Sequence, residues 1–129
     1  MRRPFVMQKN DDFYSAAKWR HCAARAMSRA NYQDKVAARY GKMIQAEMVH
    51  HALPLEDFPE YAYDPRNLVP VSRGTHRGLH LDDGGLSKEG VNVARRAARQ
   101  IGIDVENYLA AQGEGKRKRN DHGRYAGDS

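Results

Sequence analysis

The apolar residues near the start of the chain recur at the spacing of a helix. No Gly or Pro interrupts the stretch from Phe13 to Arg29, and its apolar side chains fall close to one helical face, with basic side chains over the rest of the surface. Asp11 and Asp12 stand where an N-cap is needed. The pattern predicts one long amphipathic helix over about 13–29, with Trp19 and Cys22 among its core residues.

Shorter elements are predicted in the middle of the chain. A second helix over about 33–40 ends at Gly41, which favours the left-handed conformation that stops helices. Four prolines punctuate the region that follows, so most of it is predicted to be loop. We expect an extended segment over 43–51, a loop over 53–67, a short strand over 67–71 and a short helix over 72–80.

The last third of the chain divides into a helical part and a polar tail. Ser87 is placed to cap a third helix that runs to about Ile101, Gly102 ends it, and Asp104 starts a small final helix. From Gly113 onward the sequence lacks apolar content and is rich in Lys and Arg, which predicts a disordered tail. The expected organisation is a single domain over 1–112 with a basic tail over 113–129.

Composition narrows the class of protein. A chain of 129 residues with 40% hydrophobic and 29% charged residues is typical of one soluble globular domain. No apolar run approaches the roughly 20 residues that span a bilayer, and no signal peptide is evident, so we expect a cytoplasmic protein. The single cysteine excludes an intrachain disulfide and a multi-cysteine zinc site. The net charge of +6 favours a polyanionic partner such as DNA.

Four of the six histidines lie between positions 50 and 80. Neighbouring side chains on an extended segment point to opposite sides, so His50 and His51 are not expected to bind the same ion. One of them can coordinate a cation while the other accepts a proton at neutral pH. When this pair is taken alone, a structural or incidental role explains it better than a functional one.

Two further histidines complete a metal-binding pattern. His76 and His80 are four residues apart, so on a helix they share a face and can chelate one ion. Together with one histidine of the earlier pair they give three imidazoles around a cation, which leaves positions open for water or substrate, as in catalytic metal sites. Asn67 lies between the two groups, where its amide can bridge the loop backbone and orient His51, although spacing alone favours a plain turn asparagine at this position.

These residues resemble the HNH endonuclease motif. The resemblance rests on separations of 16, 9 and 4 residues between His51, Asn67, His76 and His80, close to those of colicin-type HNH nucleases, and on three segments. The helix that begins at Phe13 also resembles the lead-in of phage-encoded HNH proteins, so the resemblance covers roughly 13–81. The segments are Val49-His50-His51-Ala52-Leu53-Pro54, Tyr63-Asp64-Pro65-Arg66-Asn67-Leu68-Val69-Pro70 and Thr75-His76-Arg77-Gly78-Leu79-His80.

The resemblance implies a fold and a chemistry. The fold would be α+β, mostly helical, with a small ββα-metal core over about 43–81. His50, His76 and His80 would hold one divalent metal ion (Mg²⁺, Mn²⁺, Ni²⁺ or Zn²⁺), His51 would be the general base, and Asn67 would orient it. DNA would be the substrate, and a phage or prophage setting would add terminase and portal as partners.

Two arginines flank the histidines of the expected short helix. Arg73 and Arg77 are candidates for contacts to DNA phosphates, because guanidinium groups bind phosphate oxygens in a bidentate fashion. Ordinary solvated arginines would look the same in the sequence.

The chain departs from a common branch of the family in one respect. That branch carries two Cys-x-x-Cys pairs, and the matching positions here are Asp34 with Ala37 and Ser72 with Thr75. The structural zinc of that branch should therefore be absent.

Two other functions compete with nuclease activity. The chain could be a DNA-binding accessory module that keeps the metal fold but contributes little catalysis. It could also be an interaction domain with a structural zinc, which would need a fourth protein ligand such as Asp82 or Asp83.

Overall fold

A two-stranded antiparallel hairpin lies at the centre of the fold. The structure is a computed structural model, and it describes residues 12–112. Strand β1 (Met48–His51) pairs with β2 (Leu68–Val71), with His50 opposite Val69. Helix α4 (Arg73–Gly78) follows β2 directly, which completes a ββα unit. The predicted α+β class is confirmed, because helices dominate and the one sheet has two strands.

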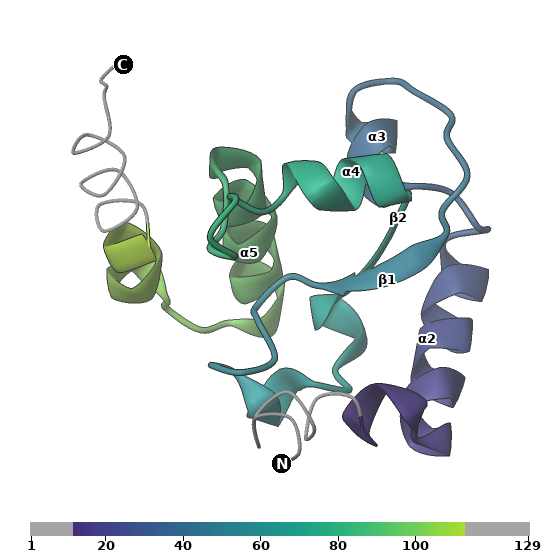
Figure 1. The fold of residues 1–129 in the computed structure, drawn as a ribbon, viewed down its shortest axis with the longest axis horizontal. Helices are drawn as coiled ribbons and strands as arrows, with labels where there is room; N and C mark the ends of the chain where they lie inside the picture. Colours follow the sequence, from purple (N-terminus) through teal and green to yellow (C-terminus); the bar gives the residue numbers. More distant parts are fainter. Residues whose placement is uncertain (1–11, 113–129) are drawn as a thin grey trace, which may run out of the picture.

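Helices enclose this hairpin on its two sides (Figure 1). Helix α2 (Ala17–Arg29) contacts both strands, and α3 (Lys35–Arg39) contacts β2. Helix α5 (Lys88–Ile101) packs against the second of two 3-10 turns in the loop between the strands, Pro59–Tyr61 and Pro65–Asn67. The central core cluster joins the hairpin to these helices and consists of Val36, Ala52, Val71, Leu79, Val93 and Ala97. Within residues 12–112, no helix is long and apolar enough to cross a membrane.

The single helix predicted over 13–29 is interrupted, so that prediction is wrong at its start. Residues 12–15 are helical, Ala16 is extended with ψ of 146°, and α2 begins only at Ala17. Nothing in the local sequence requires a break. The break allows the ring of Phe13 to pack against Trp19, with ring centroids 5.3 Å apart. The packing of aromatic rings therefore outweighs local helix propensity at Ala16.

Several other elements are shorter than predicted. Helix α3 starts at Lys35 because the side chain of Asp34 caps it, and it stops before Gly41, whose φ is +78° as expected. Strand β1 starts at Met48 and not at residue 43, and α4 ends at Gly78 and not at residue 80.

The C-terminal half follows its predicted pattern closely. Ser87 caps α5 by accepting a hydrogen bond from the backbone of Gly90, and Gly102 ends the helix with φ of +91°. Residues 106–112 are helical, after Asp104 has accepted a hydrogen bond from the backbone of Glu106. The predicted basic tail over 113–129 lies outside the described residues.

A buried carboxylate, Asp34, lies at one of the four positions that the sequence comparison matched to the cysteine pairs. The Asp34 side chain is fully buried and accepts hydrogen bonds from the backbone of Val36 and Ala37 at 3.0 and 2.9 Å, and from Ser72 at 2.9 Å. The Ser72 hydroxyl in turn donates to the Thr75 hydroxyl at 3.1 Å. The four positions that align with the cysteine pairs thus meet in a hydrogen-bonded cluster, which ties the start of α3 to the start of α4.

Hydrogen bonding controls the charge of this carboxylate. Burial alone raises the pKa of Asp34, but hydrogen bonds from Ala37, Thr75 and Ser72 outweigh burial and hold the pKa below its usual value. Asp34 is therefore ionised at neutral pH and can satisfy several donors at once, much as a bound ion would satisfy several ligands.

We expect Asp34→Asn to destabilise the fold by about 2–4 kcal/mol at pH 7, because an amide NH₂ group would face backbone donors. A depressed pKa contributes stability above the unfolded value of about 3.9, and this contribution is lost as the pH falls through the folded value. Urea unfolding should therefore show the gap between wild type and variant shrinking below about pH 4. Asp82→Asn, at an exposed position, is the matched control and should change little.

The start of α5 holds the end of α4 in place. The Ser87 hydroxyl donates to the carbonyl of Gly78 at 2.6 Å, and the Ser87 backbone donates to the carbonyl of Leu79 at 3.0 Å. Gly90 lies so close that a Cβ atom there would overlap the carbonyl oxygen of Leu79. The absent side chain lets the two helices approach, and this contact fixes the backbone just before His80.

Gly90→Ala should destabilise the protein by about 1–3 kcal/mol, the usual cost of forcing a methyl group into a packed contact. The control is Gly74→Ala inside α4, where a Cβ atom meets open space and where alanine should stabilise the helix by up to about 1 kcal/mol. Thermal unfolding of the two variants compares them directly. Equal stability of both would show that the close approach of α5 is not required.

Candidate metal centre

Three histidines from separate parts of the ββα unit come together. One ring nitrogen from each of His50, His76 and His80 lies within 4.8 Å of the others. His50 is on β1, His76 is on α4, and His80 follows the helix in a β-bridge with Leu86. The expectation that one helix carries both later histidines is therefore wrong for His80, but the turn after the helix keeps the two imidazoles together, with ring centroids 4.9 Å apart.

The surroundings of His50 and His76 favour the neutral, metal-binding form of the imidazole. His50 is 3% exposed, and burial, together with the neighbouring His76, His80 and His51, lowers its pKa to about 3. Burial and His80 also lower the pKa of His76. Neutral imidazoles have a nitrogen lone pair to offer, so the cluster is ready to coordinate a cation at neutral pH.

One buried atom in the cluster lacks a partner. Nε2 of His50 forms no hydrogen bond to any described residue, although it is fully enclosed. A buried polar atom without a partner is costly, and a cation between the three rings would remove that cost. Among residues 12–112 the cluster holds three imidazoles and no carboxylate, so Asp82 and Asp83 are not part of it. The donor set fits a divalent metal with open coordination positions.

His51 points away from the cluster toward α2. Its ring stacks on Trp19, with centroids 4.8 Å apart and planes 29° apart, and Phe13 lies 5.8 Å away. Nε2 lies 3.0 Å from the carbonyl oxygen of Ala62, which can only accept, so Nε2 carries the hydrogen and Nδ1 has the lone pair. The Tyr14 hydroxyl lies 3.5 Å from Nδ1.

Burial of His51 also sets its protonation state. The imidazole is 7% exposed, and burial lowers its pKa, while the hydrogen bond to Ala62 partly opposes that effect. The ring is therefore neutral at pH 7 and can take up a proton on Nδ1.

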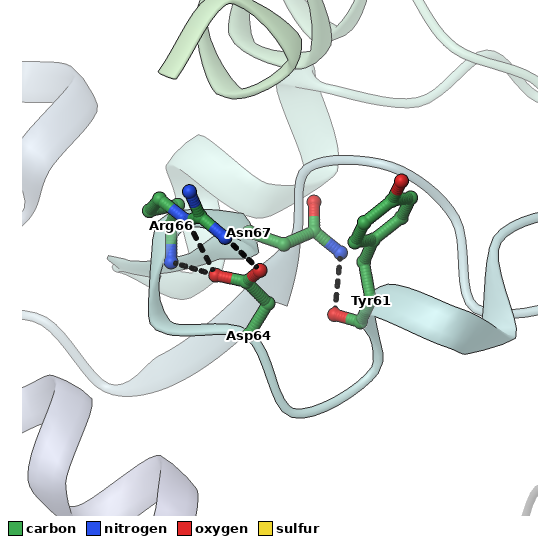
Figure 2. A network of polar contacts seen from close by, with 4 residues as sticks. All are labelled: Tyr61, Asp64, Arg66 and Asn67. Carbon is green, nitrogen blue, oxygen red and sulfur yellow. Dashed lines mark hydrogen bonds and ion pairs between the residues drawn. The ribbon is translucent and has the colours of Figure 1, made fainter. Parts of the chain in front are cut away.

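Asn67 holds the loop between the strands. It is fully buried; its Oδ1 accepts from the Leu53 backbone at 2.6 Å, and its Nδ2 donates to the carbonyls of Leu53 and Tyr61, each at 3.2 Å. Figure 2 shows the contact to Tyr61, beside the separate pair of Asp64 and Arg66. The amide bridges the loop backbone as expected, and it acts next to Ala62, the hydrogen-bond partner of His51.

The two arginines proposed for phosphate binding lie on the surface. Arg73 and Arg77 are both exposed on α4. The backbone of Arg73 donates to Glu47 at 2.8 Å, and its guanidinium lies 4.0 Å from the same carboxylate. Their contact with DNA remains a prediction.

A cleft of about 810 Å³ lies between α2 and β1 and gives access to both groups of histidines. Its charged lining residues are Arg20, Glu47 and Glu56. Trp19 and Tyr14 also line it, and sequence reasoning missed both as site residues, because Trp19 was assigned to the core. No local signal marks either residue, since their place beside His51 depends on the break at Ala16.

The fold is similar to one that has been solved for a phage nuclease. The crystal structure of an HNH endonuclease from the deep-sea thermophilic bacteriophage GVE2, with a manganese ion, matches with a TM-score of 0.53 and 23% sequence identity. The match covers 54% of this chain and 76% of that one. No protein-family model matches the chain, and no curated protein matches it. The chain therefore has the HNH endonuclease fold that its motif predicts.

We expect Asn67→Ala to destabilise the fold by about 2–3 kcal/mol, because it leaves buried backbone groups of Leu53 and Tyr61 without partners. The matched control is Asn92→Ala, at an exposed position on α5. Chemical denaturation measures both variants, and unchanged stability of the Asn67 variant would contradict the bridging role. Calorimetric titration with Mn²⁺ should show that metal affinity is largely kept, because the Asn67 side chain bonds to Leu53 and Tyr61 and to none of the three clustered imidazoles.

Proposed function

We propose that this protein is a metal-dependent HNH endonuclease that hydrolyses phosphodiester bonds in DNA, by nicking or cutting. The observation that carries the proposal is that two neighbouring residues of β1, His50 and His51, lie in two different environments. Three imidazoles converge, one of them with a buried, unpartnered nitrogen on His50, and the next residue, His51, holds a separate neutral imidazole with a defined tautomer.

His50, His76 and His80 are the residues that would hold one divalent ion, whether Mg²⁺, Mn²⁺, Ni²⁺ or Zn²⁺. When bound, such an ion stabilises negative charge on the phosphoryl oxygen and on the departing oxygen. The manganese ion of the similar phage structure supports this class of cofactor. Three protein ligands leave coordination positions for water and substrate.

His51 is the residue that would move the proton. Its Nδ1 accepts a proton from the attacking water, while its Nε2–H keeps its hydrogen bond to the carbonyl of Ala62. That carbonyl dipole and the stacked face of Trp19 both favour the imidazolium formed in this step. Asn67 acts as a positioning residue, because it fixes the loop that carries Ala62.

The surroundings of the reaction follow from the resemblance. Arg73 and Arg77 would contact DNA phosphates from α4, next to the histidine cluster. A phage or prophage protein working in the cytoplasm of a bacterial host, alongside terminase and portal in genome packaging, is the setting that this family implies.

Exchanging each histidine for alanine should separate the two roles. His51→Ala removes the base but no ligand, so Mn²⁺ should still bind while plasmid cleavage falls by roughly 10²- to 10⁴-fold. His76→Ala removes a ligand, so metal affinity should fall first, and some cleavage should return at high metal concentration. Calorimetric titration with Mn²⁺ beside a plasmid-cleavage assay measures both effects. His21→Ala, at an exposed position on α2, is the control and should change neither.

Two results would contradict the assignment. If His51→Ala loses the metal, the neighbouring histidines have been given the wrong roles. If the wild-type protein binds metal and DNA but cleaves no plasmid with Mg²⁺, Mn²⁺, Ni²⁺ or Zn²⁺, the protein is an accessory DNA-binding module.

A further inference from the structure

A second groove lies along β2, whereas the histidine cleft lies along β1. The second groove has a volume of about 440 Å³, lies between α2, α3 and α5, and shares no lining residue with the cleft along β1. Its floor is apolar and includes the buried side chains of Val36 and Ala97. The charged residues that line it all carry positive charge: Arg29, Lys35, Arg39, Arg66 and Arg96.

The two grooves differ in charge. Among the described lining residues, the histidine cleft has two acidic side chains, Glu47 and Glu56, against one basic side chain, Arg20, whereas the groove along β2 has five basic side chains and no acidic one. Duplex DNA carries about one negative charge per 1.7 Å of its length, so binding depends on many cations. The histidine cleft supplies few of them, even when Arg73 and Arg77 on α4 are added, and the groove along β2 supplies more.

Most of the cations in this groove are available to a ligand. Arg29, Lys35, Arg39 and Arg96 form no ion pair with another described residue. Arg95, which precedes Arg96 on α5, is by contrast paired with Glu106 at 2.8 Å and does not line the groove.

The fifth cation is fixed in direction. The guanidinium of Arg66 forms a bidentate pair with Asp64, with Nε and Nη2 at 2.9 and 2.7 Å from the two carboxylate oxygens (Figure 2). Its charge is compensated, and its position at the edge of the groove is set by that pair. The free positive charge of the groove therefore comes from the other four side chains.

The arrangement of these charges favours an extended ligand. The basic residues come from α2, α3, the 3-10 turn before β2, and α5, so they surround the groove and do not form a single row on one helix. Lys35 and Arg39 are four residues apart on α3, where like charges repel and destabilise a helix slightly. A polyanion with several phosphates would relieve that repulsion and contact several of the cations at once.

We propose that the groove along β2 binds the phosphate backbone of DNA. The DNA segment in this groove is separate from the segment that reaches the histidines. The choice of DNA rests on the proposed function. The contacts are to phosphates, so binding at the groove is independent of base sequence. The protein would thus contact its substrate at two separate sites, one lined by β1 and the other by β2.

The test compares two triple variants that lose the same charge. Arg29→Gln, Lys35→Gln and Arg39→Gln together remove three cations from the groove, while Arg25→Gln, Lys88→Gln and Arg99→Gln remove three exposed cations that do not line it. Binding of a fluorescein-labelled 30-base-pair duplex of arbitrary sequence is measured by anisotropy across a salt series, with a chelator present so that no DNA is cut. Circular dichroism confirms that both variants fold.

In the groove variant the slope of log affinity against log salt should be less steep by about 2–3, at about 0.9 per lost phosphate contact. The groove variant's Kd at 100 mM salt should rise about tenfold relative to the control variant, while its affinity for Mn²⁺ stays unchanged. Should the triple variant unfold, Arg29→Gln and Arg39→Gln should each lower the slope by about 0.9. Equal slopes for groove and control variants would overturn the proposal.

The outcome for the groove is independent of the outcome for catalysis. Loss of DNA binding in the groove variant, with no plasmid cleavage by the wild type in any metal, would support the groove and refute the nuclease. Plasmid cleavage by the wild type, with equal DNA binding by the groove and control variants, would refute the groove alone. Wild-type protein that binds no duplex DNA would overturn the groove proposal as well.

Discussion

The alternation of side chains along one short β-strand is the constraint on which the candidate site depends. Because neighbours on a strand face opposite ways, His50 enters a cluster of imidazoles while His51 enters an aromatic pocket. The pairing of β1 with β2 fixes this register, since a slip of one residue would exchange the two environments. Other elements complete the two environments. His76 and His80 join His50, while Trp19 and the carbonyl of Ala62 contact His51.

Burial lowers the pKa of both His50 and His51, but the two imidazoles have different hydrogen-bond partners. His50 is kept neutral, and its Nε2 has no hydrogen-bond partner among residues 12–112, which suits it to bind a cation. His51 is kept neutral with both nitrogens assigned, one to a carbonyl and one beside a hydroxyl. The two proposed tasks, metal binding and proton transfer, would thus be separated by the direction of neighbouring side chains and not by distance along the chain.

The sequence was informative where function depends on spacing and poor where it depends on tertiary packing. The separations of the histidines were enough to predict a three-imidazole cluster, and the cap and stop of α5 followed from Ser87 and Gly102. The break at Ala16 was not predictable, because no local residue demands it and its cause is aromatic packing. The role of His80 was only partly predicted, since α4 ends early, where Ser87 takes the carbonyl of Gly78. The basic groove escaped prediction because its residues come from four elements.

The carboxylate of Asp34 makes the fold independent of zinc and of thiol chemistry at the join between α3 and α4. A scaffold tied by zinc and thiolates loses its shape when zinc is scarce or when oxidants attack sulfur, and its degradation follows the metal supply. In this chain the start of α3 and the start of α4 are joined by an aspartate with backbone and hydroxyl donors. The join between α3 and α4 should therefore keep its shape when zinc is withheld and when thiols are oxidised, because neither zinc nor sulfur takes part in it.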